Sequence, residues 1–127
     1  MSLIVACFLF CGCTQRGTQT LNQAKINHLV FFGLQNQGDR QELIGDCNQK
    51  LSSIEGVVSY WCGEHGDFGR DTVDSDYDVS VCFGFDSKED YACYLKHPAH
   101  VEVVQKWKPR WNWIRIHDVV NHSKGME

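Results

Sequence analysis

Residues 87–113 read SKEDYACYLKHPAHVEVVQKWKPRWNW. The spacing Ser87-x-x-Asp90 is a capping box, in which a hydroxyl and a carboxylate satisfy free N–H groups at the start of a helix. Pro98 cannot continue a helix interior, but it suits the first position of a new helix. The segment therefore predicts two consecutive helices that meet at a His-Pro-Ala-His corner, His97–His100.

Both predicted helices carry an inward stripe of apolar and aromatic residues. In the first helix, burial is expected for Tyr91, Tyr94 and Leu95. In the second helix, four residues are spaced four, three and four positions apart, which places them on one face: His100, Val104, Trp107 and Trp111. Pro109 is expected to kink or shorten this second helix. The corner and the stripe are where we expect a site.

The strands are predicted from alternation. Residues 26–34, INHLVFFGL, place His28, Val30, Phe32 and Leu34 on one face and Leu29 and Phe31 on the other. Because both faces are largely apolar, this strand should be buried on both sides. Further strands are predicted at residues 57–66, 77–85 and 114–120. The strand at 77–85 gathers on one face Tyr77, Val79, Val81, Phe83 and Phe85.

A helix is predicted between the first two strands. Asp39-x-x-Glu42 forms a second capping box, and Gly56 suits a left-handed helix end. Apolar residues at helical spacing follow the cap: Leu43, Ile44, Cys47, Leu51 and Ile54. The acidic loop at 67–76 lacks the glycine and distal glutamate of a calcium loop, so Asp74, Asp76 and Asp78 are expected to be solvated acids.

The element order β-α-β-β-α-β predicts an α+β, ferredoxin-like fold with a four-stranded antiparallel sheet. Helices on one face would leave the other face bare, and that face carries more large apolar side chains than a soluble monomer normally exposes. A second copy packed sheet to sheet would cover it and close a dimeric α/β barrel. We therefore expect a homodimer with a cavity between sheet and aromatic helix in each protomer.

The N-terminal end differs from the rest. Residues 1–13 form an uncharged apolar leader, and residues 14–25 form a polar tether. Phe10-Cys11-Gly12-Cys13 resembles a bacterial lipobox, which implies lipidation of Cys13 and an extracytoplasmic, membrane-anchored lipoprotein. The leader has no Lys or Arg near its start, and Phe10 stands where Leu is usual. A misassigned start in a cytoplasmic protein, or an extra buried strand, therefore remains an alternative.

Composition excludes several classes of protein. A formal net charge of -4 without a Lys/Arg cluster argues against nucleic-acid binding. The sequence contains no run of 18 apolar residues, so no transmembrane helix is expected. Outside the leader there is no CxxC and no histidine at metal-ligand spacing, so neither a metal nor a cofactor is expected. The remaining cysteines are expected to be buried thiols, with a Cys62–Cys82 disulfide as the alternative: Cys47, Cys62, Cys82 and Cys93.

Residues 26–120 resemble the stress-responsive A/B barrel (Dabb) family of the dimeric α/β barrel superfamily. The resemblance begins with NHLVFF at 27–32, IEGV at 54–57 and the strand at 77–85. Its sharpest part is YLKHPAH at 94–100, which matches the family signature Y-x-x-H-P-x-H. The resemblance divides the chain into the leader at 1–13, the tether at 14–25, the Dabb domain at 26–120 and a tail at 121–127.

The resemblance implies a dimeric barrel but no single reaction. In a related plant polyketide cyclase, the last signature histidine acts as a base and the signature tyrosine assists it. Carried over, these residues are His100 and Tyr94, with His28 in the pocket. Related barrels also include cofactor-free monooxygenases. The expected pocket comprises His28, Val30, Phe32, Val79, Val81, Phe83, Val104, Trp107 and Trp111.

Each candidate residue also has a structural interpretation. As the third residue of a helix, His100 should remain neutral and able to accept a proton, or it fixes the corner by bonding a backbone carbonyl. Tyr94 is a hydroxyl partner of His100 or a core aromatic. His97 is expected to bond the last carbonyls of the first helix. Trp107 and Trp111 either line a cavity or fill it.

Three functions follow from these alternatives. The first is an uncharacterised Dabb-domain protein that binds a small apolar ligand or serves as a stress-response dimer. The second is a cofactor-free cyclase or lyase that uses His100 as base on a small carbonyl compound. The third is a cofactor-free or haem-dependent monooxygenase. An open pocket that reaches His100 would favour binding or catalysis, and a pocket sealed by Trp107 and Trp111 would favour a structural role.

Overall fold

The computed structural model of the chain describes residues 23–123. The predicted leader, Cys13 and nearly all of the tether lie outside the described residues. No helix among residues 23–123 is long and apolar enough to cross a bilayer.

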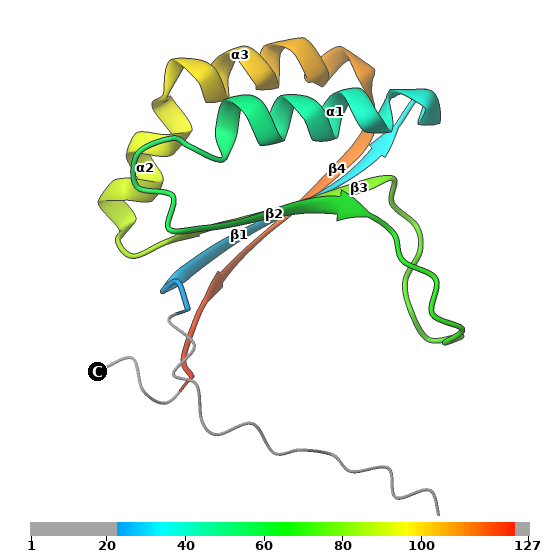
Figure 1. Ribbon diagram of the computed structural model, residues 1–127, viewed down its shortest axis with the longest axis horizontal. Coiled ribbons are helices and arrows are strands. Elements are labelled where there is room, and N and C mark those ends of the chain that lie inside the picture. The colour runs from blue at the N-terminus through cyan, green and yellow to red at the C-terminus, as the bar shows by residue number, and fades with distance from the viewer. Residues whose placement is uncertain (1–22, 124–127) are drawn as a thin grey trace, which may run out of the picture.

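A four-stranded antiparallel sheet with the order β2-β3-β1-β4 forms one layer of the molecule. Its strands are β1 (Ile26–Leu34), β2 (Ser59–Glu64), β3 (Val79–Phe85) and β4 (Trp111–Val120). The helices α1 (Arg40–Asp46), α2 (Lys88–Lys96) and α3 (Pro98–Trp107) cover one face of it (Figure 1). Short helices join these elements: η1 (Gln37–Asp39), η2 (Cys47–Leu51) and η3 (Lys108–Arg110). The ferredoxin-like prediction is confirmed.

The core lies between the sheet and this helical layer. The predicted stripe on α1 and η2 is confirmed, because Leu43, Cys47 and Leu51 are all buried. They pack against the inward residues of β1 and β3, among them Phe32 and Phe83. The helical segment ends at Leu51 with Ser52 as its C-cap, so Gly56 is not the predicted helix end; its φ of +91° belongs to the turn that follows.

A side chain caps the start of each of the helices α2 and α3. The Asp90 N–H donates to Ser87 Oγ at 3.0 Å, and Ser87 Oγ donates to Asp90 Oδ2 at 2.7 Å, which confirms the predicted cap. His97 has extended backbone, and its Nδ1 accepts from the Ala99 N–H at 3.2 Å. The side chain of His97 therefore caps the start of α3 instead of bonding the last carbonyls of α2, contrary to the sequence-based expectation.

The predicted capping box at Asp39 and Glu42 is wrong. The helical segment starts earlier, where the Asn36 side chain accepts from the Gly38 N–H at 3.0 Å, and Asp39 makes no side-chain cap. Both carboxylates instead bind the guanidinium of Arg110, at 2.9 Å for Asp39 and 2.8 Å for Glu42. Bonds to a planar, fully charged guanidinium are stronger than bonds to a neutral N–H, which explains why the two carboxylates bind Arg110 instead of capping the helix. The bonds from Arg110 and Lys106 lower the pKa of Glu42 to about 2.

The predicted helical stripe extends too far at its C-terminal end. As Pro109 indicated, α3 ends at Trp107, and Trp111 is the first residue of β4 instead of the last of a helix. Pro109 has no N–H to donate, so the chain tightens into η3 and then becomes extended. Leu95, expected to be buried, is 40% exposed, because it lies at the end of α2 where the chain turns into the corner.

Asp78 is also not the solvated acid that the sequence suggested. It is buried, and it accepts from the Leu34 N–H at 2.8 Å and from Arg40 Nη2 at 2.7 Å. Although burial opposes ionisation, these two bonds lower the pKa of Asp78. Asp78 thereby ties the end of β1 to the start of β3.

The cysteine predictions are corrected in two respects. Cys62 pairs in register with Val81, so its side chain shares the helix-covered face, where it contacts Cys47. Cys82, the next residue along β3, faces the opposite side of the sheet, which excludes the Cys62–Cys82 bridge. Of the four thiols expected to be buried, Cys93 is exposed and Cys62 is only partly buried. All the cysteines of residues 23–123 are free thiols.

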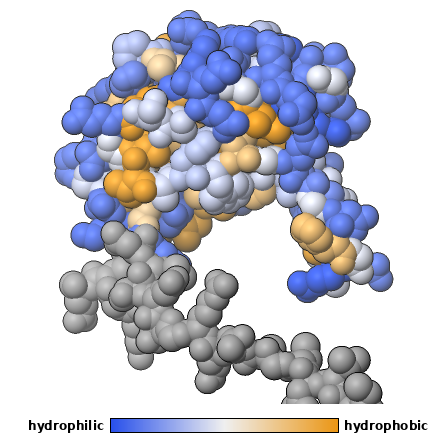
Figure 2. Space-filling view, in the orientation of Figure 1, coloured by the Kyte–Doolittle hydropathy of each residue, from blue (hydrophilic) through white to orange (hydrophobic). Residues whose placement is uncertain are grey.

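Among residues 23–123 no element covers the sheet face opposite the helices, and this face is partly apolar. The register places on it Leu29, Phe31, Trp61, Trp113 and Val119, together with the polar Asn27, Arg115 and His117. Trp61 and Val119 are each 48% exposed. The β2–β3 loop, residues 65–78, projects beyond this side (Figures 1 and 2), and its exposed hydrophobic residues include Phe68 and Val73.

Candidate functional site

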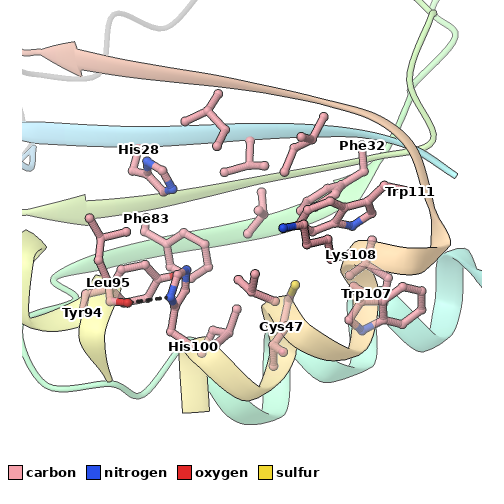
Figure 3. A pocket seen from close by; sticks show the side chains of 18 of the residues that line it. His28, Phe32, Cys47, Phe83, Tyr94, Leu95, His100, Trp107, Lys108 and Trp111 are labelled. Carbon is pink, nitrogen blue, oxygen red and sulfur yellow. Dashed lines mark hydrogen bonds between the residues drawn. The ribbon is translucent and has the colours of Figure 1, made fainter. Parts of the chain in front are cut away.

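A cavity of about 510 Å³ lies between the sheet and the helical layer (Figure 3). Its volume is in the range of small-molecule sites, and most of its lining is apolar. The residues predicted for the site that line it are His28, Val30, Phe32, Val81, Phe83, Tyr94, His100, Val104, Trp107 and Trp111. Val79 was expected there too, but it is a fully buried core residue and is not part of the lining. The cavity reaches His100 and is not filled by Trp107 and Trp111.

A hydrogen-bonded cluster of His28, Tyr91 and Asp118 lies at one end of the cavity. The register of β1 and β4 pairs His28 with Asp118, and His28 Nδ1 lies 2.6 Å from Asp118 Oδ1. The Tyr91 hydroxyl reaches across from α2, at 2.8 Å from His28 Nδ1 and 3.0 Å from Asp118 Oδ2. His28 Nδ1 on β1 is therefore held by one group from β4 and one from α2.

The chemistry of these partners fixes the tautomer of His28. A carboxylate oxygen accepts, so His28 Nδ1 carries the proton that binds Asp118, and an imidazole in this tautomer has its free lone pair on Nε2. Burial raises the pKa of Tyr91, and the bond to Asp118 adds to this effect. Tyr91 therefore remains a protonated hydroxyl and donates to Asp118.

His100 is held in the same tautomer by a different partner. Its Nδ1 lies 3.0 Å from the backbone oxygen of Leu95 (Figure 3), and a carbonyl only accepts. Nδ1 is therefore protonated and Nε2 is left as the acceptor. Burial lowers the pKa of His100. The ring is neutral as the sequence suggested, and loss of hydration on burial is the largest cause of its lowered pKa.

Tyr94 contacts both histidines through its ring. It is 1% exposed, and its ring centroid lies 4.7 Å from that of His100 and 6.3 Å from that of His28. Burial raises the pKa of its hydroxyl. Within residues 23–123, no hydrogen bond joins Tyr94 to His100. Tyr94 therefore positions the two imidazoles by packing, which corresponds to the core-aromatic alternative.

Sequence reasoning missed Asp118 and the role of the Tyr91 hydroxyl. A signal for Asp118 was present, because Ile114, Ile116 and Asp118 alternate and a carboxylate on an otherwise apolar inward face calls for a polar partner. The position of Tyr91 was predicted, but its partners were not, since they depend on the strand register. No group of His, Cys, Asp and Glu that could hold a metal occurs within the described part of the chain.

The fold and the cavity define the class: a ferredoxin-like α+β domain with a small-molecule cavity beneath its helices. The profile of the Stress responsive A/B Barrel Domain (Dabb) matches residues 26–121. The chain belongs to this family. No curated protein matches it in sequence.

Solved structures with this fold include one from the same family. The chain is similar to a Dabb-family protein with a ferredoxin-like fold from Mesorhizobium loti (25% identity over 80% of this chain and 100% of that one, TM-score 0.65). It is also similar to a dimeric ferredoxin-like protein of unknown function from Thermobifida fusca (18% identity, 82% and 97%, TM-score 0.65). A third similar structure is a hydroxynitrile lyase from Passiflora edulis (15% identity, 77% and 94%, TM-score 0.66).

Proposed function

We propose that this protein binds a small, mainly apolar organic compound in the cavity beneath its helices. The observation that supports this most directly is the cavity itself, with apolar walls and a polar end at His28 and His100. Apolar walls with a few fixed polar groups are typical of sites that bind and orient small molecules.

Binding is tested by titrating the protein with a neutral aromatic ketone, acetophenone, and following tryptophan fluorescence, because Trp107 and Trp111 line the cavity. Val104→Phe, which fills the cavity from α3, is expected to weaken binding about tenfold or more, or about 1.4 kcal/mol. Val101→Phe is the matched control, because Val101 lies on the same helix and is exposed outside the cavity lining. Absence of saturable binding by the unmodified protein would contradict the proposal.

A second candidate function is acid–base catalysis on a carbonyl compound, of the cyclase or lyase type. The observation that favours it is the pair of imidazoles on one cavity, each with Nδ1 bonded and Nε2 free to accept a proton. Asp118 is placed to stabilise the imidazolium that forms if His28 takes a proton. The hydroxynitrile lyase among the similar structures supports this candidate only through the shared fold.

Catalysis is tested by measuring exchange of the methyl protons of acetophenone in deuterium oxide by NMR. Replacing either base, as in His100→Gln or His28→Gln, is expected to slow the exchange by about 10²-fold or more. His97→Asn is the control, because His97 is outside the cavity lining and Asn preserves the cap of α3. Equal exchange in all variants would exclude the histidines as bases.

We also propose that the protein forms a homodimer through the uncovered sheet face. Trp61 and Val119 are half exposed on that face, and several similar structures are described as dimeric. Light scattering of the purified domain should give twice the mass of one chain, and Trp61→Asp should give the monomer. A monomeric unmodified protein would contradict this assignment.

Membrane attachment through Cys13 is a separate proposal, which rests on the lipobox-like sequence at 10–13. Expressed with its full N-terminus in a bacterial host, the protein should fractionate with membranes. Cys13→Ser should move it to the soluble fraction, whereas Cys11→Ser should not. Identical fractionation of the two variants would contradict lipidation at Cys13.

A further inference from the structure

The cavity has a second polar end, away from the histidines. Figure 3 shows Lys108 and Trp111 at the opposite end from His28 and His100, and all four residues line the cavity. Trp111 Nε1 is buried and has no hydrogen-bond partner within residues 23–123. A buried N–H without an acceptor costs about 1–3 kcal/mol, and such groups in native proteins call for an explanation.

Lys108 differs from the basic residues on either side of it. Lys106 Nζ lies 2.6 Å from Asp46 and 2.8 Å from Glu42, and Arg110 Nη2 lies 2.8 Å from Glu42. Lys108 makes no ion pair in the described part of the chain, and it is the one of the three that lines the cavity. A positive charge is thus available at the same end as the unpaired indole N–H.

The segment that carries both groups is firmly held. The Gln35 side-chain amide donates to the backbone oxygens of Pro109 at 3.1 Å and Trp111 at 2.9 Å. The Gln35 N–H also donates to the Arg110 oxygen at 3.0 Å. The Arg110 guanidinium stacks on Trp107, 4.0 Å from the ring centroid. The backbone that presents Lys108 and Trp111 is therefore fixed against β1 and α3.

We propose that Lys108 and Trp111 form a carboxylate-binding end of the cavity, so that the ligand is a small carboxylic acid with an apolar aryl or alkyl body. One carboxylate oxygen would accept from Trp111 Nε1, and the negative charge would be balanced by Lys108 Nζ. The apolar body would extend along the cavity toward His28 and His100. This inference rests on the proposed binding function and names the class of ligand for the same cavity.

The test compares phenylbutyrate with its neutral amide by calorimetry at about pH 7.5 and low salt. The two probes share the apolar body and differ only in the head group, which is a carboxylate in the acid and an uncharged carboxamide in the amide. The unmodified protein is expected to bind the acid about tenfold more tightly, which corresponds to about 1.4 kcal/mol. Lys108→Met should abolish that preference by weakening the acid alone, and Lys108→Arg should retain it. Trp111→Phe, which keeps a ring but removes the N–H, should weaken acid binding about three- to tenfold.

Lys96→Met is the matched control, because Lys96 is an exposed lysine that does not line the cavity. Equal affinity for acid and amide, or an unchanged preference in Lys108→Met, would overturn the carboxylate assignment and leave binding of apolar compounds intact. Failure of both probes to bind would overturn the binding function and this inference with it. Because Lys108 is exposed, its variants are expected to fold, and thermal unfolding curves check this.

Discussion

The two histidines of the cavity lie on opposite walls and are held in the same tautomer by different means. His28 belongs to the strand wall, where its Nδ1 binds the Asp118 carboxylate at 2.6 Å. His100 belongs to the helix corner, where its Nδ1 binds the Leu95 carbonyl at 3.0 Å. Both rings present Nε2 as the remaining acceptor.

The difference between the partners separates the roles that the two rings can take. A carboxylate carries a full negative charge and stabilises an imidazolium next to it, as in a catalytic triad. A backbone carbonyl orients the ring but supplies no countercharge, and burial lowers the pKa of His100. The strand wall is therefore suited to hold a proton once taken up, and the corner to keep a neutral base.

The largest effect is expected from Tyr94→Ala, because the Tyr94 ring packs against both histidines and is 1% exposed. Loss of a buried aromatic ring should reduce the free energy of unfolding by about 3–5 kcal/mol, measured by urea denaturation. Tyr94→Phe keeps the ring and should cost less than about 1 kcal/mol, because Tyr94 supports the histidines by packing. A similar loss in both variants would show that the hydroxyl, not the ring, stabilises the site.

Sequence alone predicted the fold and the helix-corner wall well, because both depend on local patterns. Alternation located β1, the Ser87 cap located α2, and Pro98 located the start of α3. His100 and Tyr94 were identified because they occupy a short signature with fixed spacing. Patterns confined to one segment need no knowledge of the partner strand.

The strand wall was only half predicted, because it depends on how distant segments align. His28 and Asp118 are 90 residues apart, and they meet because β1 and β4 pair in one particular register. The same limitation explains the error at Asp39 and Glu42, whose partner Arg110 lies about 70 residues away in the sequence. A carboxylate near a helix start fits a cap equally well until the distant cation is known.

The next largest effect is expected from Asp118→Asn, which removes the charge from the strand wall and leaves the corner intact. The side chain of Asp118 is 49% exposed, so the loss of unfolding free energy should be modest, about 1–2 kcal/mol. Long-range nitrogen NMR should show His28 changing from one Nδ1–H tautomer to a mixture, because an amide both donates and accepts. His100 should be unaffected. An unchanged His28 signal would show that Tyr91 alone sets its tautomer.

The smallest effect is a pH dependence that belongs to the corner. Because burial lowers the pKa of His100, the unfolded chain takes up a proton there near the ordinary value of about 6.5, before the folded chain does. The stabilisation is therefore complete above about pH 7 and is lost as the pH falls below about 6.5, with a slope of at most about 1.4 kcal/mol per pH unit.

Unfolding measured in urea between about pH 5 and pH 8 should show this loss relative to His100→Gln, in which residue 100 cannot titrate. His97→Asn, which alters the exposed corner histidine, is the control. Because this variant still contains His100, its free energy of unfolding should fall at low pH as it does in the unmodified protein. Parallel stability curves for the unmodified protein and His100→Gln would mean that His100 is protonated as readily in the folded as in the unfolded chain, and the contrast between the two walls would then rest on geometry alone.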